Sequence, residues 1–211
     1  MDGDLAPLSD LASLAERYDA TLYVDDAHGT GIMGPTGRGT IEQFGLERRI
    51  PFHMGTLSKA LGSHGAYIVG ANDLIHYLIN VTRPFIFTTA LPPAIAAAAS
   101  AAIAVIQHEP ERRMRLWSNR QRLFNGIQKL GFRMTETVSP ILPILVGDAA
   151  TASALAERLL THGIYASAIR PPTVPEGTSR IRFTVTSEHT IEQIDEALHA
   201  LDLAGRETGL L

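Results

Sequence analysis

Two short apolar segments, each ending in a polar turn, constrain the fold of this chain most strongly. The first runs from Thr21 to Val24 and leads into Asp25-Asp26-Ala27-His28-Gly29-Thr30-Gly31. The second leads into Gly55-Thr56-Leu57-Ser58-Lys59-Ala60-Leu61-Gly62. Short apolar runs bounded by turn residues are typical of strands, and α/β sheets bind ligands at the carboxyl ends of their strands. The two segments therefore predict a ligand site that combines carboxylates, a histidine and one lysine.

These residue types fit an aldehyde cofactor, pyridoxal 5'-phosphate (PLP). Lys59 lies among small and apolar residues, where a lysine can lose solvent and form a Schiff base. Asp25 can keep a pyridine nitrogen protonated, and His28 can reach a phenolic oxygen from the same turn. Thr56 and Ser58 offer hydroxyls for a phosphate. The sequence thus predicts a PLP site.

The adjacent carboxylates also have a simpler interpretation. Asp25 and Asp26 at a strand end could form an ordinary turn closed by a side-chain hydrogen bond. Because His28 and Lys59 accompany them, we expect Asp25 to be the pyridine partner and Asp26 to secure the loop. The other histidines show no metal-ligand spacing, so no metal site is predicted.

The pattern of apolar residues divides the chain near residue 110. Residues 1–110 are expected to form an α/β domain with a mainly parallel sheet. Its expected strands are 21–24, 52–55, 66–70 and 85–88, and its expected helices are 7–18, 72–81 and 93–107. Residues 111–211 are expected to form a small α+β domain with an antiparallel sheet. Its expected helices are 111–130, 150–162 and 191–203, and its expected strands are 132–136, 141–146, 165–169 and 180–186.

Six ordered blocks resemble the α-oxoamine synthases, a PLP-dependent group of fold type I. They are Met1-Asp2-Gly3-Asp4 with Ala6-Pro7-Leu8, Asp25 to Gly31, Gly37-Arg38-Gly39, Thr56 to Ala60, Thr88-Thr89-Ala90-Leu91-Pro92-Pro93, and Ala168 to Gly177. The resemblance implies that residues 1–110 are the second half of a fold-type I large domain. It further implies that residues before Met1, including a histidine that stacks on the cofactor, are missing. We therefore expect a truncated chain, whose own activity is in doubt.

The resemblance also implies an activity and its substrates. Enzymes of this group condense an amino acid with an acyl thioester and release carbon dioxide. The block from Ala168 to Gly177 is most similar to members that join L-alanine to a pimeloyl thioester, carried by coenzyme A or acyl carrier protein, in biotin biosynthesis. Glycine-using members such as 2-amino-3-ketobutyrate CoA ligase are the alternative. An inactive fragment that only binds PLP is another.

Further residues take roles from the resemblance. Arg180 is expected to bind the substrate carboxylate through its bidentate guanidinium, with Arg182 on the same strand face in support. Thr173 is expected to contact substrate. Either Thr88 or Thr89 is expected to reach the phosphate of a partner subunit, which implies a homodimer with a shared active site.

The composition excludes some classes of function, and a second sequence motif suggests an alternative one. The net charge of −4 gives no reason to expect nucleic-acid binding, and the absence of cysteine excludes disulfides. The longest apolar run, from Ala94 to Ile106, is too short to cross a bilayer, so we expect a cytoplasmic enzyme. Gly29 to Gly34 also fits the GxGxxG fingerprint of nicotinamide-dependent oxidoreductases. Pro35 and further glycines stand where that motif needs a helix, so dinucleotide binding is the remote alternative.

Overall fold

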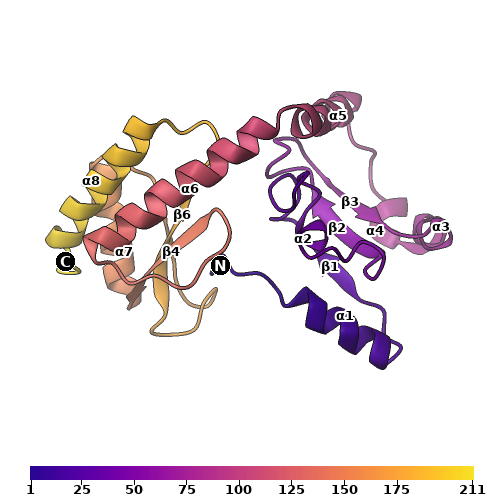
Figure 1. The fold of residues 1–211 in the computed structure, drawn as a ribbon, viewed down its shortest axis with the longest axis horizontal. Coiled ribbons are helices and arrows are strands. Elements are labelled where there is room, and N and C mark those ends of the chain that lie inside the picture. Colours follow the sequence, from indigo (N-terminus) through magenta and orange to yellow (C-terminus); the bar gives the residue numbers. More distant parts are fainter. The chain divides into compact units, whose positions relative to one another are not determined.

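The computed structural model describes residues 1–211, which form two compact units (Figure 1). One unit comprises Ala6–Pro110, and the other comprises Glu111–Leu211 together with Met1–Leu5. The division after Pro110 lies where the composition changes. The first five residues, which the sequence analysis placed with residues 1–110, group with the second unit instead.

The Ala6–Pro110 unit contains a small mixed sheet and its helices. Its elements are α1 (Leu8–Arg17), β1 (Tyr23–Asp25), α2 (Thr40–Gln43), β2 (Phe52–Thr56), β3 (Ala66–Val69), α3 (Asn72–Val81), α4 (Arg83–Ile86) and α5 (Pro93–His108). The strand order is β1-β2-β3, with β1 parallel to β2 and β2 antiparallel to β3. The expected mainly parallel sheet is therefore corrected to a mixed one.

One face of β1 packs on a small core. Leu8 and Ala12 of α1, Ile41 of α2, Leu46 and Ile50 are buried together, and Val24 packs against them. Because side chains alternate along a strand, Tyr23 and Asp25 lie on the opposite face. The rings of Tyr23 and Phe52 pack there with their centroids 4.5 Å apart.

The Glu111–Leu211 unit is built on an antiparallel sheet, as the sequence predicts. Its elements are α6 (Pro110–Leu130), β4 (Ile141–Gly147), α7 (Ala149–Thr161), β5 (Ser167–Ile169), β6 (Ser179–Thr184) and α8 (Ile191–Glu207). The strand order is β4-β6-β5, and both pairs are antiparallel. Leu142, Ile144, Leu155, Leu159, Ile181 and Leu201 are fully buried between sheet and helices.

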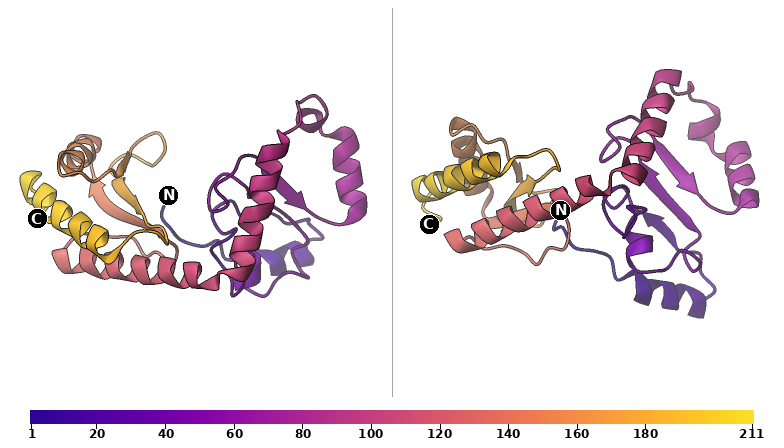
Figure 2. Two further views of the ribbon diagram at one scale, coloured as in Figure 1. Left: turned by 90° about the horizontal axis from the view of Figure 1, so that it is seen from above. Right: turned by 45° about the horizontal axis from the view of Figure 1, so that its top comes forward.

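Helices α6 and α8 lie side by side (Figures 1 and 2). Arg122 of α6 forms a bidentate ion pair with Asp195 of α8, with distances of 2.8 and 2.6 Å. Further along, a Cβ at Gly126 would collide with the side chain of Leu198, so glycine permits the close approach of the two helices. None of the helices is both long and apolar enough to cross a membrane.

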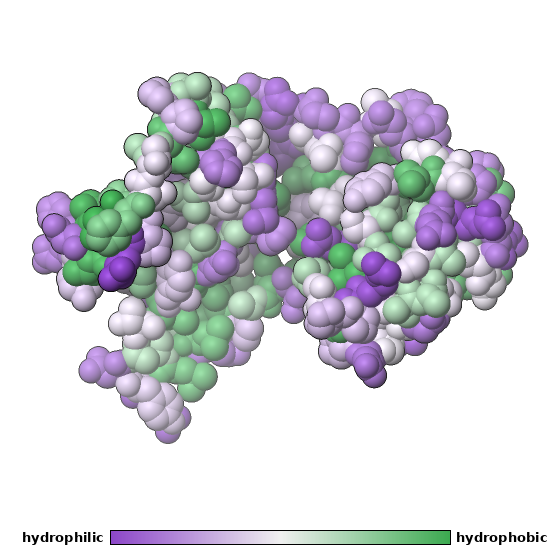
Figure 3. All heavy atoms as spheres, turned by 180° about the vertical axis from the view of Figure 1, so that it is seen from behind, coloured by the Kyte–Doolittle hydropathy of each residue, from purple (hydrophilic) through white to green (hydrophobic).

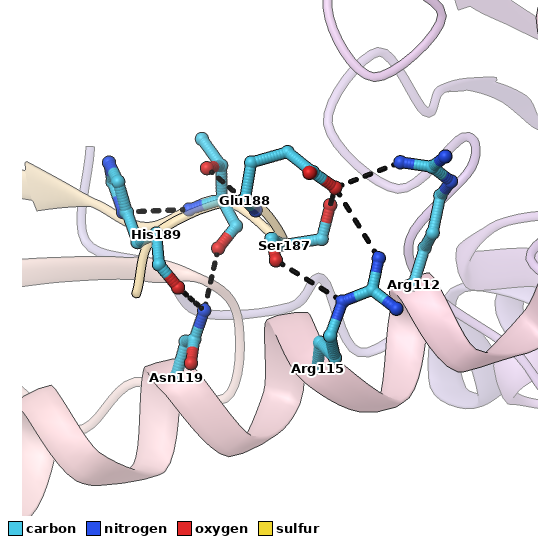
Figure 4. A network of polar contacts seen from close by, with 7 residues as sticks. Arg112, Arg115, Asn119, Ser187, Glu188 and His189 are labelled. Carbon is cyan, nitrogen blue, oxygen red and sulfur yellow. Dashed lines mark hydrogen bonds and ion pairs between the residues drawn. The ribbon is translucent and has the colours of Figure 1, made fainter. Parts of the chain in front are cut away.

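A polar network ties the loop after β6 to α6 (Figure 4). The buried Asn119 amide donates to the carbonyls of Thr186 and His189, at 3.0 and 2.8 Å. Glu188 in the same loop accepts from Arg112 at 2.8 Å and from Arg115 at 3.4 Å. These contacts fix the connection between β6 and α8.

Two predicted strands are wrong. Residues 85–88 do not form a strand, because Arg83–Ile86 form the short helix α4 with a proline in its first turn. Residues 132–136 make only one bridge, Met134 to Ile144. The following residues bond to the amino-terminal segment instead: Val138 N and Thr137 Oγ1 both donate to the Gly3 carbonyl at 3.0 Å.

Candidate active site

The carboxyl ends of β1 and β2 bring the first group of predicted site residues to one sheet edge. The two strands are parallel, and Asp25 lies opposite Met54. Because side chains alternate, Asp25, Met54 and Thr56 share one face of the sheet. The predicted acid and the predicted hydroxyl thus lie at the same edge and on the same face.

Asp25 is exposed at the end of β1, and only one of its two carboxylate oxygens accepts a hydrogen bond. Its Oδ1 accepts a hydrogen bond from Ala27 N at 3.0 Å, and the structure gives Oδ2 no partner. His28 is exposed three residues later. It lies within a turn in which the amides of Gly29 and Thr30 donate to the Asp26 carbonyl, at 3.1 and 3.0 Å. This arrangement leaves one carboxylate oxygen able to bind a cationic ring nitrogen.

The end of β2 and the loop after it carry Thr56, Ser58 and Lys59. The Thr56 and Ser58 hydroxyl oxygens lie 2.8 Å apart, and Thr56 Oγ1 also donates to the Gly65 carbonyl at 3.1 Å. The loop is closed by Leu57 N donating to the same carbonyl at 2.9 Å. Lys59 is exposed on this loop and takes part in no ion pair of the chain.

Asp26 secures the loop after β1, as the sequence predicts. Its buried carboxylate accepts a hydrogen bond from Thr40 N at 2.7 Å and another from Thr40 Oγ1. Gly29 and Gly39 lie directly against this carboxylate, and a Cβ at either position would collide with it. Burial raises the pKa of Asp26, and the two bonds from Thr40 oppose that shift.

The glycine-rich loop does not form a dinucleotide site. No helix opens after Gly34, and the next helix, α2, begins only at Thr40. The loop donors are already used: Glu42 accepts from Thr36 N and Arg38 N at 3.1 and 3.0 Å, and Gln43 accepts from Gly34 N at 3.1 Å. The remote oxidoreductase alternative therefore lacks both the helix and the free amides that a pyrophosphate needs.

The predicted substrate arginines belong to the other unit. Arg180 on β6 is buried, its guanidinium is ion-paired with Asp2, and its Nε donates to the Thr178 carbonyl at 3.0 Å. Arg182 lies on the same strand face, and its Nη1 is 3.7 Å from Met1 Sδ. Asp2 therefore competes with any other carboxylate for Nη1 of Arg180.

Arg170, another arginine of this unit, was not among the predicted site residues. Arg170 directly follows β5, is exposed, and donates to the hydroxyl of Ser153 at 3.0 Å without a carboxylate partner. The amide of Thr173 donates to the Arg170 carbonyl at 3.0 Å, so the two residues share a tight turn. The available signal was an arginine at a predicted strand end, within the block that carries the family resemblance.

The two remaining predicted residues, Thr88 and Thr89, lie after α4. Both are exposed, and no hydrogen bond of their side chains is present in the chain. Their hydroxyls are therefore open to a ligand.

Comparison with known proteins agrees with the resemblance. A putative 8-amino-7-oxononanoate synthase of Geobacillus kaustophilus is 50% identical to this chain over 212 aligned residues. An 8-amino-7-oxononanoate synthase of Symbiobacterium thermophilum and 8-amino-7-oxononanoate synthase 1 of Bacillus subtilis are each 46% identical over 211 residues. The alignments cover all of this chain but 54% of each relative, so the chain spans about half their length.

Solved structures show the same fold. Serine palmitoyltransferase of Sphingomonas wittichii matches with a TM-score of 0.96 at 37% identity. The match covers all of this chain and 53% of the palmitoyltransferase chain. A serine palmitoyltransferase of S. paucimobilis, solved with a bound PLP–myriocin aldimine, also reaches 0.96, at 38% identity over all of this chain and 54% of its own. 8-Amino-7-oxononanoate synthase of Francisella tularensis gives 0.84 at 29% identity, over 98% of this chain and 60% of its own. The family model for aminotransferase class I and II matches residues 1–201, and the chain belongs to that family.

Proposed function

We propose that this chain carries the lysine-bearing part of an 8-amino-7-oxononanoate synthase. The proposed reaction condenses L-alanine with a pimeloyl thioester, of coenzyme A or acyl carrier protein, and releases carbon dioxide. The observation that carries the proposal is the set of an amine, a carboxylate and paired hydroxyls at one sheet edge, in a chain 46–50% identical to such synthases.

The residues at this edge fit PLP. The Oδ2 atom of Asp25 has no partner in the chain and can accept a hydrogen bond from a protonated pyridine nitrogen. The hydroxyls of Thr56 and Ser58 lie 2.8 Å apart, and they can donate to a phosphate once they turn away from each other and from the Gly65 carbonyl. Lys59 offers an amine without a competing carboxylate. PLP, when bound, supplies an electrophilic aldehyde and a ring that accepts electrons.

Each side chain then has a defined task. Lys59 Nζ would hold the cofactor through its aldehyde carbon and, as a free amine, would accept the α-proton of alanine. Asp25 holds the proton on the pyridine nitrogen, which keeps the ring an effective electron acceptor. His28 orients the ring through its phenolic oxygen. Thr56 and Ser58 bind the phosphate, and Thr88 or Thr89 reaches the phosphate of a partner subunit in a homodimer.

Two arginines are candidates for the alanine carboxylate. Arg180 is the choice that follows from the family resemblance, and Thr173 is expected to contact substrate beside it. Arg170 is the choice that the geometry favours, because it is exposed and lacks a carboxylate partner, whereas Arg180 is buried and paired with Asp2.

The chain offers an internal control for the test of cofactor binding, because Lys59 and Lys129 are its only lysines. The purified chain is mixed with PLP, reduced with borohydride and digested, and the labelled peptide is identified by mass spectrometry. We expect the label on Lys59, with Lys129 unlabelled. Lys59→Ala should abolish the label and Lys129→Ala should retain it. Equal labelling of both lysines, or of the Met1 amine alone, would exclude the assignment of Lys59.

Substrate choice needs a separate assay. The purified chain is mixed with PLP, a pimeloyl thioester and either L-alanine or glycine. The release of carbon dioxide is then measured. Release with alanine supports the proposed synthase. Release with glycine alone would identify a glycine-using member of the group. Label on Lys59 without turnover of either amino acid would identify a fragment that binds PLP but is inactive.

A further inference from the structure

Thr30 lies in the turn that carries His28 and is a buried polar residue. Elsewhere in the Ala6–Pro110 unit even apolar residues reach the surface, green in Figure 3, whereas Thr30 is only 9% exposed. A buried hydroxyl needs hydrogen-bond partners. Thr30 Oγ1 has two, the Asp26 carbonyl oxygen and the Tyr67 phenol oxygen, each at 3.0 Å. Tyr67 belongs to β3, so this hydroxyl joins β3 to the turn after β1.

The direction of the bond between Tyr67 and Thr30 follows from the chemistry of the groups. A threonine hydroxyl carries one proton, and a carbonyl oxygen can only accept. Thr30 therefore gives its proton to the Asp26 carbonyl. The Tyr67 phenol must then donate to Thr30 Oγ1. Tyr67→Phe would remove this donor and keep the ring.

Gly55 of β2 lets the phenol reach the turn. It lies opposite Tyr67 in the antiparallel pair of β2 and β3. A Cβ at Gly55 would collide with both Tyr67 Oη and Thr30 Oγ1. Because side chains alternate along β2, this contact lies on the sheet face opposite to the one that Asp25 and Thr56 share. Tyr67 therefore supports the turn from behind and does not touch a ligand on the Asp25 face.

The same turn packs against the loop that carries Lys59. Gly31 has a positive φ of 81°, and a Cβ at this position would lie 3.0 Å from the Cβ of Ala60. Ala60 directly follows Lys59 in the sequence. Gly31 N also donates to the Gly37 carbonyl at 2.9 Å, which closes the turn. A displacement of the turn would therefore change the position of His28 relative to Lys59.

We propose that Tyr67 is a positioning residue of the candidate active site. By donating to Thr30 it holds the turn of residues 26–31, and through this turn it sets where His28 stands relative to Lys59. This role rests on the proposed function, since it concerns side chains to which PLP binding is assigned there. The opposing interpretation is that the Tyr67 ring only fills space beside β2. Tyr67→Phe distinguishes the two.

The first measurement uses the 211-residue chain without PLP. The amides of Gly29, Thr30 and Gly31 are hydrogen-bonded, so their hydrogen exchange reports how firmly the turn is held. We expect Tyr67→Phe to speed this exchange by about fivefold, because one hydrogen bond of ordinary strength is lost. Tyr77→Phe, at a position of α3 that is 63% exposed, is the matched control and should leave the exchange unchanged. Equal exchange in the wild type and Tyr67→Phe would overturn the proposal.

A second readout separates a displaced His28 from a turn that is merely looser. The His28 ring is followed by NMR, and its signal is assigned from its loss in His28→Gln. We expect Tyr67→Phe and Thr30→Val to shift this signal, and Thr30→Ser, which keeps the hydroxyl, to leave it in place. In the Thr30→Val background, Tyr67→Phe should have no further effect, because it acts through Thr30. An unmoved signal in Tyr67→Phe, or effects that add in the double variant, would make Tyr67 a structural residue only.

The last measurement adds PLP and separates this proposal from the proposed function. The pH at which the visible absorption of bound PLP changes depends on the protein groups around its ring, so it should shift in Tyr67→Phe and not in Tyr77→Phe. If PLP binds and this pH is the same in both variants, Tyr67 does not position the site. If the wild-type chain binds no PLP, the proposed function fails for this chain, and the exchange and NMR comparisons still decide the role of Tyr67. Circular dichroism and urea unfolding check that each variant folds.

Discussion

At the scale of single residues, the two arginine candidates differ in their burial and in their contacts with the rest of the chain. Arg180 is ion-paired with Asp2 and buried, whereas Arg170 is exposed beside Ser153. Removal of Arg180 leaves the Asp2 carboxylate without its partner, while removal of Arg170 breaks only a bond to a hydroxyl. Stability and substrate affinity therefore separate the two roles.

We expect Arg180→Gln to lower the free energy of unfolding by about 1–3 kcal/mol, because it breaks a charge-assisted bond at a buried guanidinium. Arg170→Gln should leave stability nearly unchanged. Denaturant unfolding measures both effects.

Steady-state kinetics of an active enzyme preparation that contains this chain then identify the residue that binds the alanine carboxylate. Its loss should raise the KM for L-alanine at least tenfold and leave PLP binding unchanged. If Arg180→Gln alone raises that KM, the role that the resemblance gives to Arg180 is correct. If neither variant changes the KM, both assignments fail.

His53 gives a pH dependence that can be tested at residue scale. Burial lowers the pKa of His53 below its ordinary value of 6.5, and the nearby Asp26 charge opposes that shift. Its Nδ1 is buried without a hydrogen-bond partner. A histidine whose pKa is lowered by folding supports stability above pH 6.5, and that support is lost as pH falls through the lowered pKa.

We therefore expect the wild-type chain to lose stability relative to His53→Gln as pH falls below 6.5 toward the lowered pKa of His53. Burial raises the pKa of Asp26, which acts in the opposite sense, and Asp26 is present in both proteins. Urea unfolding at a series of pH values measures the effect. His76→Gln, at an exposed position on α3, is the control and should follow the wild type. Parallel curves for wild type and His53→Gln would contradict the prediction.

At the scale of elements, local pattern was enough for most helices. The expected helix at 72–81 has the same bounds as α3, and α7 begins after Asp148, whose side chain accepts from Ala150 N and Thr151 N. α8 begins with a capping box formed by Thr190 and Gln193. Helices are well predicted because their periodicity and caps are local in sequence.

The wrong strand predictions have tertiary causes. The apolar residues at 85–88 resemble a strand, but Pro84 favours a helical first turn and no strand lies beside them. The segment at 132–136 was expected to pair throughout, but the Gly3 carbonyl takes the donors of Thr137 and Val138 just beyond it. A strand needs a partner, and an isolated sequence window does not show which partner is available.

The contact between α6 and the loop after β6 can be tested directly. Asn119→Ala removes two hydrogen bonds to carbonyls of this loop, and we expect it to lower the free energy of unfolding by about 1–3 kcal/mol. Glu188→Gln in the same loop breaks only exposed ion pairs and should have a much smaller effect. Thermal unfolding compares the two. Equal effects would mean that charge, and not the buried amide, holds the loop.

At the scale of the whole molecule, the two units differ in how well their helices are packed. α8 buries Ile194, Ala200, Leu201, Ala204 and Gly205, whereas α3 buries none of its residues. Local stability follows the number of buried apolar groups. We therefore expect the amides of α3 and α5 in the isolated chain to exchange with solvent at least tenfold faster than those of α7 and α8. Hydrogen exchange with mass spectrometry measures this, and uniform protection in all four helices would contradict it.

The sequence alone determined the identity of the family, the position of both polar turns and the longer helices, because ordered motifs and local periodicity are properties of the chain itself. It also predicted that Asp26 would secure its loop. Tertiary structure decided the mixed sheet, the loss of two expected strands, the pairing of Arg180 with Asp2 and the exposure of Arg170. These depend on which distant segment satisfies a backbone edge or a buried charge, and no local pattern records that partner.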